Sequence, residues 1–256
     1  MFDEVKSYYE NYDEEGRLFR DKAHLPEYLT TIRYFDRLFT PGSRILDACA
    51  GTGRYSFYLA GKNHMVTACD LVEHNLNIIK SKPEADKLAG INLCNVLDLS
   101  KFKDNSFDAV LCMGALYHLR SNDLREKAVS ECVRVCRDGG IIVLAYITRI
   151  GAIFASIAED VSNMDGLIKI LDDTNDGIFY CIAPREIEEI AVKYGLEKLH
   201  NISTDGMIYN VGSKLINASE ENFNKYMEYH YLTCEDESII GASMHGLWIG
   251  RKGLTR

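Results

Sequence analysis

The residues with the clearest chemical potential lie in one segment, where an apolar stretch runs into a glycine turn. Residues 45–54 read Ile-Leu-Asp-Ala-Cys-Ala-Gly-Thr-Gly-Arg. Gly51 and Gly53 tolerate unusual backbone angles and, lacking Cβ atoms, let a ligand approach the main chain closely. Asp70 closes the next apolar stretch, 23 residues after Asp47, where an acid can accept hydrogen bonds from both hydroxyls of a ribose. Together these features indicate a site for a nucleoside-containing cofactor.

The residues around the glycine turn help to distinguish between two classes of nucleoside cofactor. A dinucleotide requires small residues at three positions and a pyrophosphate seated on the helix N-terminus. The third position is Ser56, and Asp47 is a poor neighbour for a pyrophosphate. An acid at a strand end instead suits a cofactor with positive charge, such as the sulfonium and ammonium groups of S-adenosylmethionine. The charge pattern therefore favours the methyl donor.

Several blocks, in order, resemble the class I S-adenosylmethionine-dependent methyltransferases of the small-molecule, methyltransferase-11/25-like type. The resemblance covers residues 30 to 150 well and the rest loosely. The family's first motif, acid-x-Gly-x-Gly-x-Gly, falls on residues 47–53, with Cys49 in place of the first glycine. Residues 137–141 resemble the family's Pro-Gly-Gly turn, with Asp138 in place of the proline. The resemblance implies S-adenosylmethionine as the cofactor.

The resemblance also implies where the cofactor would be held. Asp70 corresponds to the ribose-binding acid of the family. Asn95 begins the segment that holds the adenine, and its side-chain oxygen can accept a hydrogen bond from the adenine amino group. Residues 107–119 correspond to the edge beneath the methionine end of the cofactor. The expected cofactor contacts are Asp47, Ala48, Gly51, Gly53, Asp70, Leu71, Asn75, Asn95, Val96 and Met113.

Titratable and aromatic side chains near the predicted strand ends are candidates for the acceptor side of the reaction. His118 is the preferred general base, because an ordinary histidine has a pKa of about 6.5, near working pH; Glu27 comes second. The expected acceptor contacts are Tyr117, His24, Arg149, Tyr226 and His245. For each of these residues, packing in the core or exposure on a helix face is the alternative interpretation.

Alternating strands and helices are expected to position these residues. Short apolar strands are predicted at residues 45–49, 65–69, 91–94, 107–113 and 141–147, with helical stretches between them, which implies a parallel sheet. Later strands are predicted at 196–203 and 247–250, and helices from Pro26 onward and at 124–136, 152–158, 184–195 and 222–232. The resemblance implies a Rossmann-like α/β fold with a seven-stranded sheet in the order 3-2-1-4-5-7-6, its seventh strand antiparallel.

We expect a single methyltransferase domain over residues 1–256. Its cofactor-binding core would span residues 41–150. An N-terminal helical lid, residues 1–40, and two later lid insertions at 151–180 and 205–240 would cover the site. The lid segments have no role in a bare cofactor domain, so we expect them to enclose a small acceptor.

Net charge, cysteine spacing and the lengths of the apolar runs argue against several classes of binding partner. The formal charge is −9, with 38 acidic against 29 basic residues, so phosphate backbones should be repelled and a nucleic-acid substrate is disfavoured. The eight cysteines form no C-x-x-C pair, which favours reduced, buried thiols and no metal site. No export signal is evident, and the longest apolar run, residues 141–147, is far shorter than a membrane span of about 20 residues. We therefore expect a cytoplasmic protein without a membrane partner.

Two other functions remain open at this stage, as do the acceptor and the oligomeric state. A protein that binds S-adenosylmethionine without turnover is suggested by the departures from the family motifs at Cys49 and Asn95. An NAD-linked oxidoreductase is a weaker alternative, opposed by Ser56 and the missing pyrophosphate fingerprint. The acceptor is not determined, because small-molecule methyltransferases share the cofactor half and differ in the lid.

Overall fold

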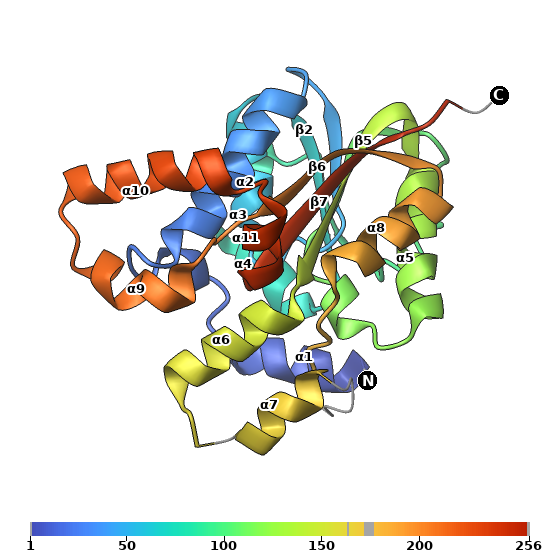
Figure 1. Ribbon diagram of the computed structural model, residues 1–256. Helices are drawn as coiled ribbons and strands as arrows, with labels where there is room; N and C mark the ends of the chain where they lie inside the picture. The colour runs from blue at the N-terminus through green and yellow to red at the C-terminus, as the bar shows by residue number, and fades with distance from the viewer. Residues whose placement is uncertain (1, 163, 172–176, 255–256) are drawn as a thin grey trace.

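The strands form a seven-stranded sheet in the order β3-β2-β1-β4-β5-β7-β6 (Figure 1). The computed structural model describes residues 2–162, 164–171 and 177–254. Strands β1 to β5 pair in parallel, whereas β7 runs antiparallel to β5 and β6. The strands are β1 (Arg44–Asp47), β2 (Met65–Asp70), β3 (Gly90–Leu93), β4 (Phe107–Cys112), β5 (Cys136–Ile147), β6 (Leu196–Ser203) and β7 (His245–Lys252). The predicted Rossmann-like sheet order and the antiparallel seventh strand are confirmed.

Helices cover both faces of this sheet. The helices are α1 (Phe2–Asn11), α2 (Leu25–Leu38), α3 (Arg54–Gly61), α4 (Glu73–Ser81), α5 (Asn122–Val135), α6 (Arg149–Glu159), α7 (Met164–Leu171), α8 (Pro184–Lys193), α9 (Ile208–Ile216), α10 (Glu220–Thr233) and α11 (Glu237–Ala242). Single turns of 3₁₀ helix lie at Arg17–Phe19, Pro83–Lys87 and Leu116–His118. Helices α5 and α8 pack on one face, and α2 and α3 on the other.

The strand side chains alternate between these two layers. In β5, Ile142 and Leu144 belong to the core beneath α5 and α8, whereas Ile141 and Val143 belong to the core beneath α2 and α3. Successive side chains of a strand point to opposite faces, so a parallel sheet covered on both faces needs a nearly continuous apolar run. This explains why the short apolar segments of the sequence are central strands.

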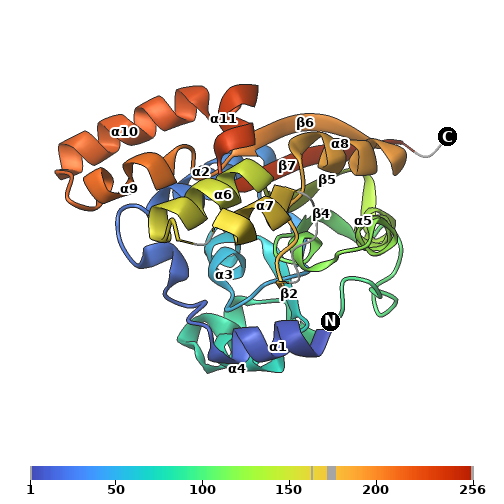
Figure 2. The same ribbon diagram turned by 60° about the horizontal axis from the view of Figure 1, so that its bottom comes forward.

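The helices outside the sheet core lie around the edge at which β1 to β5 end. Helix α1 runs beside α4 (Figures 1 and 2), and α6 contacts α7, α9 and α11. Helices α9 and α10 form a separate apolar cluster with the start of α2. The predicted lid insertion at 151–180 includes residues 163 and 172–176, which lie outside the described residues, as does Met1 of the predicted N-terminal lid.

Residues 138–140 differ from their predicted role. The resemblance implies a turn at these residues after the helix predicted at 124–136, but α5 ends at Val135 and they already belong to β5. Gly139 has a φ of +71°, and a Cβ at Gly140 would lie 2.6 Å from Sγ of Cys136. The pairing of β4 with β5 shifts register at this level. The glycines therefore accommodate an irregularity at the start of β5.

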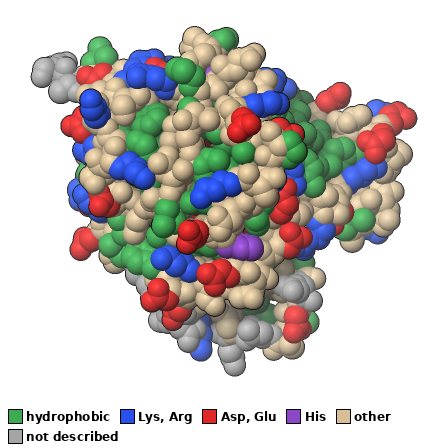
Figure 3. All heavy atoms as spheres, turned by 180° about the vertical axis from the view of Figure 1, so that it is seen from behind, with side chains coloured by type: hydrophobic (Ala, Val, Ile, Leu, Met, Phe, Trp, Pro, Cys, Tyr) green, Lys and Arg blue, Asp and Glu red, His purple; other side chains and the backbone are tan. Residues whose placement is uncertain are grey.

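The charge on the surface and the length of the helices are relevant to the expected absence of nucleic-acid and membrane partners. On the face seen in Figure 3, the Lys and Arg side chains of the described residues are interspersed with Asp and Glu side chains instead of gathering in a basic patch. No helix within residues 2–162, 164–171 and 177–254 combines the length and apolar character needed to cross a membrane.

Candidate active site

The glycine turn between β1 and α3 lies against the end of β2. Gly51 and Gly53 have φ values of +52° and +86°, in the left-handed region that glycine adopts without strain. A Cβ at Gly53 would lie 2.9 Å from the Phe57 ring. The turn is tied to β2 because Ala50 N donates to the Cys69 carbonyl at 2.7 Å. The turn therefore requires glycine at both positions, and the packing against Phe57 requires it again at Gly53.

Asp70, at the end of β2, holds this turn from the other side. Its carboxylate accepts hydrogen bonds from Gly51 N and Val72 N, both at 2.8 Å, and from the Asn75 side chain at 3.3 Å. Burial raises the pKa of Asp70, and this outweighs the backbone N–H groups, which act to lower it. The Oδ1 atom of Asn75 is buried without a hydrogen-bond partner among the described residues.

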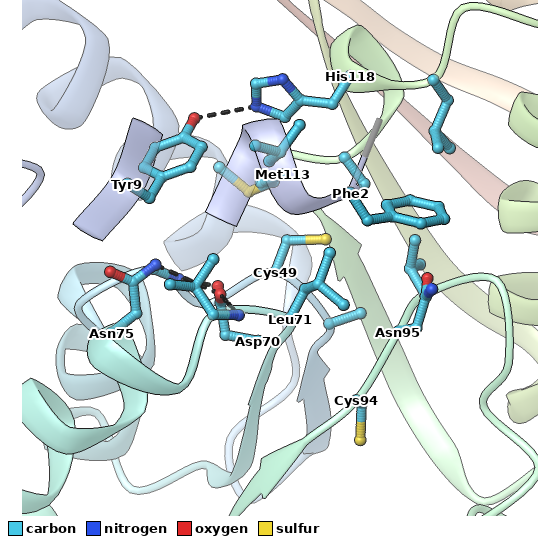
Figure 4. Close-up of a pocket in the computed structure, with 18 of the residues that line it drawn as sticks. Phe2, Tyr9, Cys49, Asp70, Leu71, Asn75, Cys94, Asn95, Met113 and His118 are labelled. Carbon is cyan, nitrogen blue, oxygen red and sulfur yellow. Dashed lines mark hydrogen bonds between the residues drawn. The ribbon is translucent and has the colours of Figure 1, made fainter. Parts of the chain in front are cut away.

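A pocket lies directly above these groups, at the carboxyl ends of the parallel strands (Figure 4). We call it the edge pocket; it has about 710 Å³ of space between the protein atoms. Helix α1 closes one side with Phe2, Val5 and Tyr9. Open α/β sheets bind ligands at this edge. Of the expected cofactor contacts, the edge pocket is lined by Ala48, Gly51, Asp70, Leu71, Asn75, Asn95, Val96 and Met113.

Asp47 and Gly53 are not among the lining residues of the edge pocket in the described part of the chain. Asp47 is 2% exposed and accepts a hydrogen bond from Ser56 Oγ at 2.6 Å. Burial raises the pKa of Asp47 to about 7. Gly53 is the last residue of the turn and caps the N-terminus of α3. Both residues support the turn in this structure, and their contact with a cofactor stays a prediction.

The side-chain oxygen of Asn95, expected to face an adenine, already accepts a hydrogen bond from Leu97 N at 3.0 Å. A carbonyl-type oxygen has two lone pairs, so it can accept a second hydrogen bond. This bond fixes the orientation of the Asn95 amide at the wall of the edge pocket. The expectation that Asn95 contacts the adenine stays a prediction.

His118 lies at the far wall of the edge pocket, where it contacts α1 (Figure 4). Its Nδ1 lies 2.9 Å from the Ile178 carbonyl and its Nε2 lies 3.0 Å from the Tyr9 hydroxyl. Because a carbonyl can only accept, Nδ1 carries the proton and Nε2 accepts from Tyr9. Burial lowers the pKa of His118. The imidazole is therefore neutral, with both nitrogens engaged.

A second pocket adjoins the first on the side of the N-terminal segment. It has about 640 Å³ of space and shares Glu14, Cys49, Gly51, Met113 and Tyr117 with the edge pocket. We call it the polar pocket, because its other lining residues include Arg17, Glu27, Thr52, Arg54 and His245. The two pockets are therefore adjacent, with the shared residues between them.

An ion pair crosses the wall of the polar pocket. Arg17 donates to both carboxylate oxygens of Glu27, at 2.7 and 2.9 Å, and its Nε lies 3.4 Å from Glu14 Oε1. Burial alone would raise the pKa of Glu27, but Arg17 and His245 outweigh it and lower that pKa to about 2. Glu27 is thus a fixed anion, which makes it a poor proton acceptor.

His245, at the start of β7, faces the same pair. Its Nδ1 lies 2.7 Å from Asp205 Oδ2 and 3.6 Å from Glu27 Oε2. Burial works to lower the pKa of His245, but Glu27 and Asp205 outweigh it and raise that pKa above its usual value. Of the expected acceptor contacts, His245 and Tyr117 line the polar pocket.

The sheet order, the glycine turn and the edge pocket agree with the comparison to known proteins. A family model described as a methyltransferase domain matches residues 46–144. Residues 46–144 therefore match the methyltransferase-domain family, and the sheet has the strand order of the Rossmann-like methyltransferase fold. The match includes the glycine turn, Asp70 and the block after β4.

Known methyltransferases resemble the chain beyond this match. It is 37% identical over 106 residues to the demethylmenaquinone methyltransferase of Renibacterium salmoninarum and 31% identical over 148 residues to that of Bacillus cereus, or 41% and 56% of this chain. These alignments cover 41% and 59% of the relatives, so the chain spans about half the length of the curated relatives it matches. The 1,6-didemethyltoxoflavin-N1-methyltransferase of Burkholderia thailandensis shares the fold, with a TM-score of 0.57 and 15% identity over 98% of this chain and 86% of that chain.

Three of the expected acceptor contacts lie elsewhere in the described structure. His24 pairs with Asp21 at 2.8 Å beside the start of α2, and Arg149 pairs with Glu186 of α8 at 3.0 Å. Tyr226 packs in the cluster of α9 and α10. None of the three is among the described residues that line either pocket, so their contact with an acceptor stays a prediction that the geometry does not support.

Sequence reasoning missed Glu14, Arg17 and Asp205, which complete the polar pocket and its support. None of the three belongs to a periodic pattern or a motif. Asp205 follows β6 by two residues, and Glu14 and Arg17 lie in the irregular stretch between α1 and α2. A local signal exists only for Asp205, which, like Asp70, is an acid just after a predicted strand.

Proposed function

We propose that the protein transfers the methyl group of S-adenosylmethionine to a small acceptor. The cofactor would occupy the edge pocket and the acceptor the polar pocket. The observation that carries this proposal is that the two pockets meet at shared residues beside the glycine turn. A methyl group held at that junction would lie next to a nucleophile held in the polar pocket.

The residues of the edge pocket fit the cofactor. Asp70 presents a buried carboxylate at the end of β2, and the unpartnered Oδ1 of Asn75 offers a further acceptor there. Hydroxyl and amino groups of a nucleoside are the donors that such oxygens require. Leu71, Val96 and Met113 supply apolar walls, as is typical of a small-molecule site.

Methyl transfer from S-adenosylmethionine requires the protein mainly to orient the two substrates. The bound cofactor supplies a methyl group that is already activated by the sulfonium. The protein then contributes orientation and the exclusion of water. We assign exclusion to α1, whose Phe2, Val5 and Tyr9 cover the edge pocket, which extends the predicted N-terminal lid to a specific helix.

A small acceptor is supported by the polar pocket and by the relatives. The polar pocket combines apolar walls with a few charged side chains, which is typical of a small-molecule site. The relatives from Renibacterium and Bacillus are named for demethylmenaquinone, and the Burkholderia protein for 1,6-didemethyltoxoflavin. Tyr117 and His245 are our proposed acceptor contacts. The preferred base His118 lines the edge pocket with both ring nitrogens hydrogen-bonded. Glu27 is held as an anion by Arg17 and His245. These observations do not favour either residue as the general base.

Binding measurements test the cofactor half. Isothermal titration calorimetry should show binding of S-adenosylmethionine and S-adenosylhomocysteine, and much weaker binding of NAD, because the turn lacks a pyrophosphate seat. Tight NAD binding without binding of the methyl donor would overturn the proposal.

A turnover assay tests methyl transfer to a small acceptor. The protein is incubated with S-adenosylmethionine labelled in its methyl group and with a small-metabolite extract, beside an extract of protein and nucleic acid. We expect label in the small-molecule fraction. Cofactor binding without transfer to any fraction would favour the non-catalytic binding protein.

A further inference from the structure

The junction between the two pockets is where a reacting atom of the acceptor would meet the methyl group. The shared lining residues that can titrate are Glu14, Cys49 and Tyr117. A neighbouring thiol, Cys112, and burial hold the pKa of Cys49 well above its usual value, and burial strongly raises the pKa of Tyr117. Among the described residues that line both pockets, Glu14 is therefore the one that can be ionised at neutral pH.

Glu14 lies against the glycine turn. A Cβ built at Gly51 would be 3.5 Å from Glu14 Cγ and 3.8 Å from its Oε1. The Glu14 side chain is 21% exposed. Arg17 commits both terminal nitrogens to Glu27 and reaches Glu14 only through Nε, at 3.4 Å. Glu14 is consequently held near the turn while its carboxylate is much less engaged than that of Glu27.

The charges around Glu14 leave it able to take a proton. Burial raises its pKa, Arg17 acts to lower it, and Glu27 and Asp70 add to the increase, with a net rise above the usual value. A carboxylate with a raised pKa is a stronger base than one on the surface. Tyr9 and Tyr117 also face this region and remain protonated, because burial raises the pKa of both.

We propose that Glu14 is the general base of the methyl transfer and that its carboxylate faces the transferred methyl group. The proposal rests on the proposed function. The bond from sulfur to the methyl carbon breaks, with its electron pair left on sulfur, as the nucleophilic O, N or S of the acceptor bonds to that carbon. The proton of the nucleophile passes to a carboxylate oxygen of Glu14 and then to water.

The other candidate bases are less well placed. His118 lines only the edge pocket, and His245 only the polar pocket. Glu27 carries the lowered pKa imposed by Arg17 and His245. A base must lie within hydrogen-bond reach of the proton it removes, and that proton is on the atom nearest the methyl group.

The test uses sinefungin, a cofactor analogue in which a carbon bearing an amino group replaces the methylated sulfonium. Its ammonium group occupies the position of the methyl group, whereas S-adenosylhomocysteine has nothing there. Calorimetry measures both ligands on the wild type, on Glu14→Gln and on Glu15→Gln. Glu15 is a matched control, because it is the adjacent carboxylate, pairs with Arg54 and Lys82, and is not among the described residues that line either pocket.

We expect Glu14→Gln to weaken sinefungin about tenfold or more, the effect of losing a charge-assisted hydrogen bond, and to change the affinity for S-adenosylhomocysteine less than about threefold. Glu15→Gln should change neither. If S-adenosylhomocysteine binds the wild type and Glu14→Gln leaves the sinefungin affinity unchanged, the placement of Glu14 is wrong. If S-adenosylhomocysteine does not bind the wild type, the proposed function itself fails.

Turnover separates a base from a group that only attracts charge. With a small acceptor found by the labelled-methyl screen, Glu14→Gln should lower kcat about 100-fold or more, the lower range for general-base catalysis, with a KM for S-adenosylmethionine near that of the wild type. Loss of sinefungin affinity without a fall in kcat would overturn the base assignment.

Discussion

Asp70 illustrates what a single carboxylate does at the residue scale. Its two oxygens accept from Gly51 N, Val72 N and Asn75 Nδ2, and it still lines the edge pocket. The backbone bonds fix the glycine turn, and the remaining lone pairs can receive ribose hydroxyls. One acid therefore couples the shape of the turn to nucleoside binding.

Replacing Asp70 by Asn should weaken S-adenosylhomocysteine by about 1.5–3 kcal/mol, because an NH₂ group replaces an acceptor oxygen and the charge is lost. Calorimetry measures the dissociation constant, and thermal unfolding shows whether the fold survives. Asp98→Asn is the control, since Asp98 is an exposed acid after the neighbouring strand that accepts from Ser100 N. An unchanged constant for Asp70→Asn would place the ribose elsewhere.

Helix α1 shows how an element closes the site. It has ten residues, of which Val5 is buried, and a helix this short is marginal on its own in water. The Tyr9 hydroxyl binds His118, and the ring of Tyr8 meets that of Phe179 edge-on at 5.6 Å. These contacts hold α1 over the edge pocket. Because α1 forms one wall, we expect it to move when a cofactor enters or leaves.

Tyr9→Phe should loosen this helix and let a bound ligand leave faster. A buried neutral hydrogen bond contributes about 0.5–1.5 kcal/mol, so the dissociation rate of S-adenosylhomocysteine should rise by up to about tenfold. Stopped-flow displacement measures the rate. Tyr12→Phe, which removes a hydroxyl at the end of the same segment, serves as the comparison. Equal rates in Tyr9→Phe and wild type would mean that the Tyr9–His118 bond does not restrain α1.

At the scale of the whole molecule, the buried acids make the free energy of unfolding depend on pH. The pKa of Asp47 is about 7 in the fold because of burial, against an ordinary value of 3.8. Between these values the folded state keeps a proton that the unfolded chain has released. Stability attributable to Asp47 is therefore greatest below pH 4 and is lost as pH rises toward 7. Glu27 acts in the opposite direction, because its pKa is lowered to about 2; its contribution is present above about pH 4.5 and is lost in acid.

The variant Asp47→Asn isolates the first effect. Asn cannot ionise, and its oxygen can still accept from Ser56. Relative to wild type, the variant should gain stability as pH rises from 4 to 7, by at most about 1.4 kcal/mol per pH unit. Denaturant unfolding at four pH values measures the difference. Parallel pH curves for the two proteins would show that Asp47 does not titrate in this range.

The sequence by itself determined the parts whose physical requirements are local. The apolar runs gave central strands close to their predicted bounds, with β4 at Phe107–Cys112, because burial on both sheet faces demands such runs. Glycine was required at Gly51 and Gly53 by positive φ. The helix predicted at 184–195 is found as α8, with Pro184 in its first turn, where its fixed φ suits a helix start. Most of the expected cofactor contacts line the edge pocket, because they follow parallel strands that all end at one edge of the sheet.

Tertiary structure alone decided the polar pocket and the closure by α1. Glu14 and Arg17 lie in an irregular stretch, His245 begins β7, and Asp205 reaches His245 across 40 residues. Tyr9 meets His118 across 109 residues. Spacing made His24 and Arg149 plausible, yet they pair with Asp21 and Glu186 instead. Local sequence patterns record backbone angles and burial, whereas these contacts depend on how separate segments pack around one edge of the sheet.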